Sequence, residues 1–542
     1  MADFDYVIVG AGSAGCVLAN RLTENGRYRV LVLEAGGSDR RFWVRTPIGY
    51  GRTFYDRRVN WMFLTEPDPG TGGRASYWPR GKVLGGSSSI NAMVYIRGQP
   101  GDFDDWAAAG NPGWGWCDVL PYFMKAENRH ADASHHDGAV GLLHVADVSR
   151  DLHPLCDVYL RACAELGFKV VSDMNGQEQE CVGLYQITTR NGVRASAATA
   201  YLHPARGRAN LVVLTGSHVV RILCEGLRAV GVEYRRGGEV HVARAGREII
   251  VSAGAVNSPQ LLQLSGIGPA GVLQSHGIGV LREAPAVGRN LQDHLGIDYI
   301  YRSRVPTLND ELYPWHGKLR AGLRYLVTRR GPLSLSVNQG GGFIRTRPNL
   351  ARPDMQLYFS PVSYLKAPPG KRPLMNPDPY SAFLLGLSHC RPAGRGHIEI
   401  RSGDPLSPPR ICPNYLSAES DVEEMLAGVR FLRELAGTPS FSAVIEAELK
   451  PGIEVQSRDQ LIADIRQRSG TVFHPVGTCA MGPDPSRAVV DSCLCVHGVA
   501  GLRVIDASIF PNVTSGNTNA PTIMVAEKGA AMVLEDAARS ET

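Results

Sequence analysis

His474 is a candidate for acid–base chemistry in this sequence of 542 residues, because of the residues next to it. It lies in a glycine-containing segment, residues 471–482, and Pro475 follows it directly. Because proline disfavours the α conformation of the residue before it, we expect His474 in a turn or an extended segment. A histidine placed there can titrate near neutral pH and act as a general base. Taken alone, the segment is equally consistent with a structural histidine packed at a turn.

Asn517 lies in a second polar turn, which precedes a predicted helix over about residues 522–538. Pro521 suits the first position of that helix. The partial positive charge of the helix N-terminus would stabilise negative charge that develops on a bound cofactor. In the alternative interpretation, Asn517 and Asn519 only cap the helix, a role that suits Asn519 in particular.

Other chemistries have weaker support in the sequence. Ser508 and Ser515 allow a hydrolase, but there is no Gly-x-Ser-x-Gly elbow and no identifiable acid partner. We interpret a polar stretch as a solvated loop, because its residues lack the helical spacing of metal ligands: His130, His135, His136 and Asp137. We interpret Cys493 and Cys495 as buried strand residues. We therefore predict no metal site.

A strand–turn–helix unit at the N-terminus predicts a dinucleotide-binding site. An apolar strand over residues 6–9 leads into a helix that ends near residue 22, through a turn with Gly10, Gly12 and Gly15. These glycines allow the tight turn, the approach of the backbone to a pyrophosphate and close packing of helix on strand. The helix N-terminus would bind the pyrophosphate. Glu34, after the next strand, would accept hydrogen bonds from a ribose, and its charge disfavours a 2′-phosphate. The alternative is a strand-to-helix turn without a ligand.

Length and composition exclude several classes of protein. A chain of 542 residues predicts at least two domains, and 44% hydrophobic with 20% charged residues is typical of a soluble globular protein. A net charge of +5 over this length predicts binding to neither nucleic acid nor an anionic surface. No apolar run reaches the ~20 residues that span a membrane. Eleven scattered cysteines and the lack of a leader sequence favour reduced thiols in the cytoplasm.

The remaining elements suggest a nucleotide-binding domain built from separated pieces. Strands are expected over residues 211–215, 229–234 and 248–252. The last strand leads into another turn and helix, with Pro259 near the first helical turn. An amphipathic helix is expected over about residues 419–436.

Over nearly its whole length the chain resembles the glucose–methanol–choline (GMC) oxidoreductases. The resemblance rests on residues 4–37, 81–92, 254–268 and 287–294, and on the segments around His474 and Asn517. It implies an α/β fold (α+β overall) with two domains. The Rossmann-like FAD-binding domain would comprise residues 1–155, 205–300 and 465–542, and a substrate-binding domain with an antiparallel sheet and helices would comprise residues 156–204 and 301–464.

The resemblance implies FAD-dependent oxidation of a primary alcohol to the aldehyde, by hydride transfer from the carbinol carbon to flavin N5. His474 would be the general base, and Asn517 would hydrogen-bond the substrate oxygen. Dioxygen, a quinone or a dye would accept the electrons. The alternatives are oxidation of choline or a sugar-type polyol, hydroxynitrile cleavage or light-driven decarboxylation on the same scaffold, and a redox-inert flavin-binding protein.

Residue by residue, the resemblance implies a cofactor site that extends through the chain. Ser13, Ala14, Glu34 and Ala35 would hold the ADP half, Val219 would meet the adenine, and the loop over residues 83–94 would wrap the flavin and ribityl part. The full set of cofactor-binding residues is Gly10, Gly12, Ser13, Ala14, Gly15, Glu34, Ala35, Trp61, Val83, Gly86, Asn91, Ala92, Met93, Val94, Val219, Phe473, Asp506, Ala507 and Thr518.

Two departures from family subgroups refine this expectation. Members with covalently bound flavin have a histidine at the position of Ile90, so we predict non-covalent FAD. Choline-oxidising members have a glutamate at the position of Gln339, and a neutral amide does not pair with a quaternary ammonium. We therefore predict a neutral aliphatic or aromatic primary alcohol as the substrate, contacted by Gln339 and Phe473.

Overall fold

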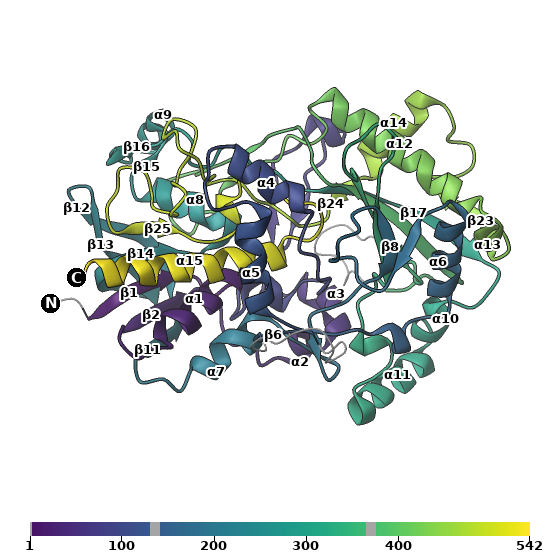
Figure 1. Cartoon of the computed structure of the whole chain (residues 1–542), viewed down its shortest axis with the longest axis horizontal. Coiled ribbons are helices and arrows are strands. Elements are labelled where there is room, and N and C mark those ends of the chain that lie inside the picture. The colour runs from purple at the N-terminus through teal and green to yellow at the C-terminus, as the bar shows by residue number, and fades with distance from the viewer. Residues whose placement is uncertain (1–2, 130–140, 365–375, 542) are drawn as a thin grey trace.

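Two β-sheets organise the computed structural model, which describes residues 3–129, 141–364 and 376–541. Figure 1 shows the first sheet on the left and the second on the right, with both chain termini beside the first. The predicted loop at His130, His135, His136 and Asp137 lies outside the described residues.

The first sheet has seven strands in the order β11-β2-β1-β14-β13-β12, with β25 also paired to β14. The parallel strands are β1 (Phe4–Val9), β2 (Val30–Glu34), β11 (Leu211–Thr215), β14 (Glu239–Val251) and β25 (Leu502–Val504). β12 (His218–Glu225) and β13 (Arg228–Arg236) extend it antiparallel. The predicted strands are confirmed, and β14 begins earlier than expected because its first half pairs with β13.

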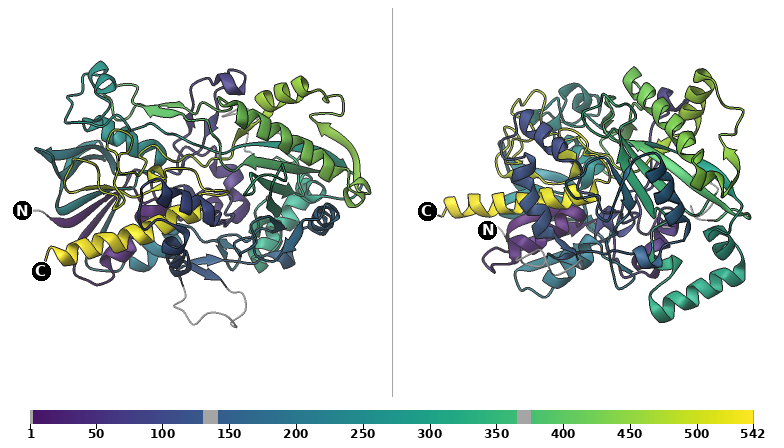
Figure 2. Two further views of the ribbon diagram at one scale, coloured as in Figure 1. Left: turned by 45° about the horizontal axis from the view of Figure 1, so that its top comes forward. Right: turned by 45° about the vertical axis from the view of Figure 1, so that its right-hand side comes forward.

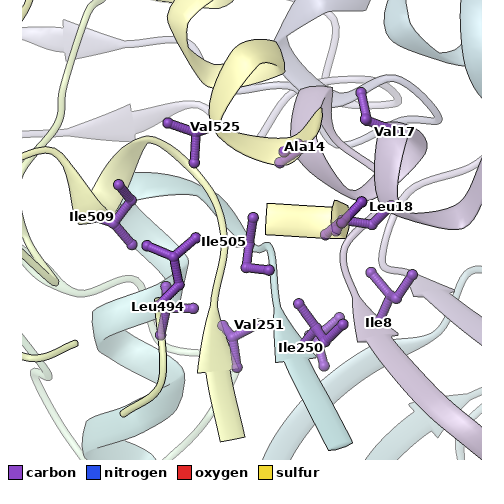
Figure 3. Close-up of a cluster of buried hydrophobic side chains, with 14 of the residues drawn as sticks. Ile8, Ala14, Val17, Leu18, Ile250, Val251, Leu494, Ile505, Ile509 and Val525 are labelled. Atoms are coloured by element: carbon purple, nitrogen blue, oxygen red, sulfur yellow. The ribbon is translucent and has the colours of Figure 1, made fainter. Parts of the chain in front are cut away.

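Helices α1 (Ser13–Thr23) and α15 (Asn519–Arg539) pack against each other over this sheet. Figure 3 shows buried side chains from these elements in one cluster: Ile8, Ile250 and Val251 from the strands, Leu18 from α1 and Val525 from α15. Because a parallel sheet is covered on both faces, its strands are continuous apolar runs. The first and last parts of the chain therefore share one hydrophobic core.

The second sheet has eight strands in the order β23-β17-β20-β19-β18-β8-β7, with β24 paired to β17. Every pairing except β7–β8 is antiparallel. Its strands are β7 (Lys169–Val171), β8 (Cys181–Leu184), β17 (Leu295–Ser303), β18 (Gly340–Ile344), β19 (Met355–Ser360), β20 (Ala382–His389), β23 (Ile445–Lys450) and β24 (Gly470–Thr471). Helix α12 (Glu419–Ala436), predicted with the same bounds, packs on β20. The α/β fold with a second, antiparallel sheet is confirmed.

Shorter elements connect the two sheets. The remaining helices are α2 (Phe42–Arg45), α3 (Tyr50–Thr53), α4 (Pro100–Ala108), α5 (Trp116–Ala126), α6 (Leu155–Glu165), α7 (His203–Ala205), α8 (Gly254–Leu264), α9 (Ala270–Ser275), α10 (Leu308–Leu312), α11 (Trp315–Thr328), α13 (Pro439–Ser442) and α14 (Arg458–Arg468). Two-stranded ribbons are formed by β3 (Phe63–Leu64) with β4 (Tyr77–Trp78), β5 (Glu127–Arg129) with β6 (Leu143–Val145), β9 (Thr189–Arg190) with β10 (Val193–Arg194), β15 (Ile267–Gly268) with β16 (Arg282–Glu283), and β21 (His397–Glu399) with β22 (Arg410–Cys412). None of the helices in the described ranges is both long and apolar enough to cross a bilayer.

Three local predictions need correction. Pro259 lies inside α8, beyond its first turn, and α15 begins at Asn519, which makes Pro521 its third residue. Cys493 and Cys495 do not form a buried strand, because the Asp491 carboxylate accepts hydrogen bonds from both of their backbone amides at 2.8 and 2.9 Å and bends the chain into a turn. Cys493 is exposed there.

Candidate active site

A cavity of about 560 Å³, within the usual range for ligand pockets, is lined by residues of both sheets. Nearly all the predicted site residues line it: Gly10, Gly12, Ser13, Ala14, Glu34, Ala35, Trp61, Gly86, Asn91, Ala92, Met93, Val94, Val219, Phe473, His474, Asp506, Ala507, Asn517 and Thr518. Folding therefore assembles segments that are hundreds of residues apart into one site.

The backbone at the nucleotide end of this cavity leaves no room for side chains. Gly10 has a φ of +98°, and a Cβ atom there would meet the carbonyl oxygen of Ser252 at 2.6 Å. A Cβ atom on Gly86 would meet the Cα atom of Gly12 at 2.6 Å. The loop at Gly86 thus lies directly on the N-terminal turn. Gly15 does not line the cavity, because it packs against the Gly10 carbonyl inside the turn.

Two helix N-termini present backbone amides to the cavity. Gly12 is the N-cap of α1 and Thr518 is the N-cap of α15; neither helix has a side-chain cap or an acidic residue in its first turn. The predicted cap Asn519 is instead the first helical residue, and its Oδ1 accepts a hydrogen bond of 2.8 Å from the Ser13 hydroxyl. These amides and the helix dipoles suit a pyrophosphate and a negatively charged ring system.

Glu34 is held rigidly at the end of β2. Its two carboxylate oxygens accept hydrogen bonds from the amides of Ala11 at 2.9 Å and Gly36 at 2.7 Å. Burial raises the pKa of Glu34 to about 7, although the two amide donors oppose the shift. Glu34 also lines the cavity, so a ribose hydroxyl bound there could donate to its carboxyl group.

His474 and Asn517 meet on the cavity wall, although 43 residues separate them in the sequence. The Asn517 Nδ2 lies 3.1 Å from the His474 Nε2. On the other side of the ring, the His474 Nδ1 lies 2.9 Å from the Nδ1 of His294, and the His294 Nε2 lies 2.9 Å from the Cys390 carbonyl oxygen.

These contacts determine which ring nitrogens carry protons. Because a carbonyl oxygen only accepts, the His294 Nε2 must donate to Cys390, and the neutral ring then leaves its Nδ1 as an acceptor. Burial lowers the pKa of His294 to about 3, so the neutral form persists at neutral pH. His474 therefore donates from Nδ1 and keeps an unprotonated Nε2 beside Asn517. Burial, together with His294 and Arg80, also holds the pKa of His474 well below its usual value.

Side chains from distant segments hold the turn that carries His474. The Asp293 carboxylate accepts the His474 backbone amide at 2.7 Å, and Arg80 donates to the Phe473 carbonyl at 2.7 Å. Phe473 has a φ of +71°, a conformation that these contacts maintain. Proline at 475 keeps the turn out of a helix, as predicted from the sequence.

Asn517 is oriented by a neighbouring strand. Gln356 of β19 donates from Nε2 to the Asn517 Oδ1 at 3.2 Å, while its own carbonyl accepts from the Tyr358 hydroxyl at 2.6 Å. The Asn517 amide therefore points its NH₂ group at His474. The sequence predicted no role for His294, Asp293, Arg80 or Gln356. Its one signal is the family motif over residues 287–294, which ends in Asp293-His294.

Two further predicted site residues lie away from the cavity. Val83, the first residue of the predicted loop, is completely buried and forms a β-bridge with Gly37. Gln339 faces α6: its Oε1 accepts from the His153 amide at 2.9 Å and from the Cys156 thiol at 3.3 Å. The neighbouring residue Asn338 lines the cavity in its place. The amide at position 339 therefore does not disfavour choline as a substrate.

The wall of the cavity beyond His474 is aromatic and apolar. Tyr50, Phe54, Val337, Tyr364 and Phe473 line it and belong to one hydrophobic cluster. Asp298 of β17 also lines the cavity, and its side chain lies over Gly386 of β20, where a Cβ atom would meet its Oδ1 at 2.4 Å.

Comparison with known proteins places the chain in a family. Family models described as GMC oxidoreductase match residues 4–296 and residues 392–526. The chain belongs to the GMC oxidoreductase family. This GMC oxidoreductase is 42% identical to alcohol dehydrogenase (acceptor) of Pseudomonas putida over 98% of the chain and 96% of that protein. It is 43% identical to mitochondrial choline dehydrogenase of Homo sapiens over 98% of the chain and 90% of that protein.

Solved structures agree with the assignment. Pyridoxine 4-oxidase from Mesorbium loti superposes with a TM-score of 0.87 at 32% sequence identity, over 98% of this chain and 99% of that chain. The resemblance inferred from the motifs is therefore confirmed. This GMC oxidoreductase is an FAD-dependent enzyme that oxidises CH–OH groups.

Proposed function

We propose that this GMC oxidoreductase oxidises a primary alcohol to the aldehyde with His474 as the general base. The observation that carries the proposal is the pairing of an unprotonated His474 Nε2 with the Asn517 NH₂ group at 3.1 Å in the cavity. A hydroxyl group inserted between them donates its proton to Nε2 and accepts a hydrogen bond from Nδ2. This complementarity fits an alcohol and aligns its proton with the base.

FAD, when bound, supplies the hydride acceptor for the carbinol carbon. The glycine turn, Glu34 and the N-terminus of α1 would hold its nucleotide half, and the loop at Gly86–Val94 with the N-terminus of α15 would hold the rest. We also propose that FAD is non-covalent, because the side chain at position 90 is isoleucine, which has no group for attachment. Acid precipitation should then leave the yellow colour in the supernatant.

The aromatic wall supports a neutral aliphatic or aromatic alcohol as the substrate, since it offers apolar surface beyond His474. A second candidate is a cationic alcohol such as choline, which the choline dehydrogenase relatives oxidise according to their names. The Asp298 carboxylate favours this candidate, because a carboxylate beside Tyr358 and Tyr364 would attract a quaternary ammonium group.

Anaerobic mixing with a panel of neutral alcohols and choline tests both parts of this proposal. Bleaching of the oxidised flavin is expected with at least one alcohol, whereas a lyase would show none. His474→Ala should retain FAD and lose at least about 10²-fold in the bleaching rate. His316→Ala, on the exposed surface of α11, is the control that should keep it. If choline is the substrate, Asp298→Asn should raise its KM without changing that of neutral alcohols.

The electron acceptor, the compartment and the domain boundaries complete the proposal. We propose a quinone or dye in place of dioxygen as the electron acceptor; the Pseudomonas putida relative is named a dehydrogenase and not an oxidase. Free thiols at all eleven cysteines, two of them exposed, support a reducing cytoplasmic setting. For the FAD-binding domain we propose residues 1–155, 205–294 and 465–542. The expected boundary at residue 300 moves to 294, because β17 of the second sheet begins at Leu295.

A further inference from the structure

Helix α11 exposes a stripe of large apolar side chains to solvent. The exposed fractions are 77% for Trp315, 55% for Leu319 and Leu323, 56% for Leu326 and 82% for Val327. At about 100° per residue these positions share one face of the helix. Figure 2 shows in its right-hand view that α11 projects from the rest of the molecule. Contiguous exposed apolar surface of this kind marks an interaction site.

The opposite face of α11 anchors the helix to the protein. Gly317, Ala321 and Tyr325 are buried there, and the Tyr325 hydroxyl donates to the Gly192 carbonyl at 3.1 Å. A Cβ atom on Gly317 would meet the Glu311 carbonyl oxygen at 1.9 Å, so the helix lies tightly against the chain before it. A surface helix needs one apolar face for packing. The outer apolar face of α11 is therefore additional to what the fold requires.

Basic side chains surround the apolar stripe. Residues 315–330 contain no aspartate or glutamate and five exposed basic residues: Lys318, Arg320, Arg324, Arg329 and Arg330. Arg330 pairs with Asp151 at 3.1 Å, and Arg329 lies over the Tyr325 ring. The net charge of +5 for the whole chain conceals this local concentration. Apolar side chains with long basic ones at their margin match the boundary between acyl chains and anionic headgroups.

We propose that α11 docks the enzyme on an anionic lipid surface, with the helix lying in the plane of the interface. Trp315, Leu319 and Leu323 would enter the acyl boundary, and the basic residues would contact lipid phosphates. A second copy of the chain is the less favourable occupant. A symmetric contact through α11 would place the same basic residues of both copies against one another.

Sedimentation of the FAD-loaded enzyme with vesicles tests the proposal. We expect binding to phosphatidylcholine vesicles that contain phosphatidylglycerol, weaker binding to phosphatidylcholine alone, and release by salt because the charges are exposed. The apolar variant, Trp315→Ser with Leu319→Ser and Leu323→Ser, should partition at least about tenfold more weakly. The charge variant, Lys318→Glu with Arg320→Glu and Arg324→Glu, should lose the preference for phosphatidylglycerol.

Matched controls separate the site from general changes of the surface. The control for the apolar variant replaces three other exposed aliphatic residues with serine: Leu227, Leu406 and Ile453, with exposed fractions of 48%, 53% and 70%. This triple variant should bind vesicles as the wild type does. The control for the charge variant replaces three exposed arginines elsewhere with glutamate: Arg228, Arg235 and Arg236. It should keep the preference for phosphatidylglycerol. Bound FAD and the melting temperature report folding in every variant. Equal vesicle binding by the apolar variant and the wild type would overturn the proposal, as would a lipid-free dimer that the apolar variant abolishes.

Discussion

At the scale of single residues, a chain of polar contacts decides the protonation of His474, the proposed general base. The Cys390 carbonyl sets the tautomer of His294, which in turn makes His474 a donor at Nδ1 and an acceptor at Nε2. Gln356 similarly orients the Asn517 amide. We propose that His294 and Gln356 are positioning residues, because each contacts one member of the proposed pair, His474 or Asn517.

Replacement of His294 should therefore impair catalysis through His474. In His294→Phe the ring volume is kept but the acceptor for the His474 Nδ1 proton is lost, and kcat should fall about 10- to 100-fold with a smaller change in KM. His294→Gln provides an amide oxygen as acceptor and should recover part of the loss. Steady-state kinetics across pH measure both variants. Equal kcat for His294→Phe and the wild type would contradict the positioning role.

The same two histidines should make stability depend on pH. Their pKa values are lowered in the folded enzyme, to about 3 for His294, while the unfolded chain binds protons with a pKa near the ordinary value of about 6.5. As the pH falls below about 6.5, these histidines bind protons in the unfolded state but not in the folded state. The free energy of unfolding therefore decreases. Each such histidine should weaken the folding equilibrium up to about tenfold per pH unit. Between pH 7.5 and 5, the midpoint of urea denaturation should shift less in His294→Gln than in the wild type. If the midpoint depends on pH equally in both proteins, this explanation is wrong.

At the scale of elements, glycines allow the loop at residue 86 to lie against the turn that starts α1. The approach of Gly86 to Gly12 brings together the two segments that we propose bind FAD, and residues at the uncapped N-termini of α1 and α15 line the same cavity. The geometry of the cofactor site thus depends on backbone contacts between elements.

Gly86→Ala should weaken FAD binding at least about tenfold, because the new Cβ atom would meet the Gly12 Cα atom at 2.6 Å and displace the loop. Gly226→Ala is a matched control: its φ of +57° is close to the +53° of Gly86, but beyond the adjacent residues a Cβ atom there would meet no atom within 4 Å. Both variants carry the cost of about 1 kcal/mol for a positive φ. Titration of the apoprotein with FAD distinguishes them, and equal affinities would show that the close approach is unimportant.

At the scale of the whole molecule, the two ends of the chain complete one domain. Glu527 of α15 is fully buried and accepts hydrogen bonds of 2.8 Å from Nε and Nη2 of Arg21 in α1, 506 residues away. Lys125 approaches the same carboxylate at 3.4 Å. The ion pair therefore links the first helix, the last helix and α5 across the core.

Arg21→Ala should destabilise the enzyme by about 3 kcal/mol, because it leaves a buried carboxylate without its main partner. The double variant Arg21→Met with Glu527→Met removes both charges and should lose less. Arg244→Ala breaks an exposed pair with Glu225 and should change stability by less than about 1 kcal/mol. Urea denaturation compares the three, and equal losses for Arg21→Ala and Arg244→Ala would refute the role of the buried pair.

The sequence by itself determined the local elements and the chemistry of the cofactor. Apolar runs and the glycine turn predicted β1, α1 and β2, the amphipathic pattern predicted α12, and the motifs predicted FAD and the pair of His474 and Asn517. These features depend on short-range periodicity and on motifs that occur within a few residues. They can be recognised before the chain is folded.

Only the tertiary structure decided what surrounds those residues. Gln339 turned away from the cavity while Asn338 and Asp298 entered it, because the face of a strand depends on its register with partners far away in sequence. His294, Arg80 and Gln356 reach His474 and Asn517 from three other segments. Tertiary packing also decides which face of α11 is buried and which apolar side chains of the helix stay exposed. Local pattern specifies which groups are present, and long-range packing decides which of them meet.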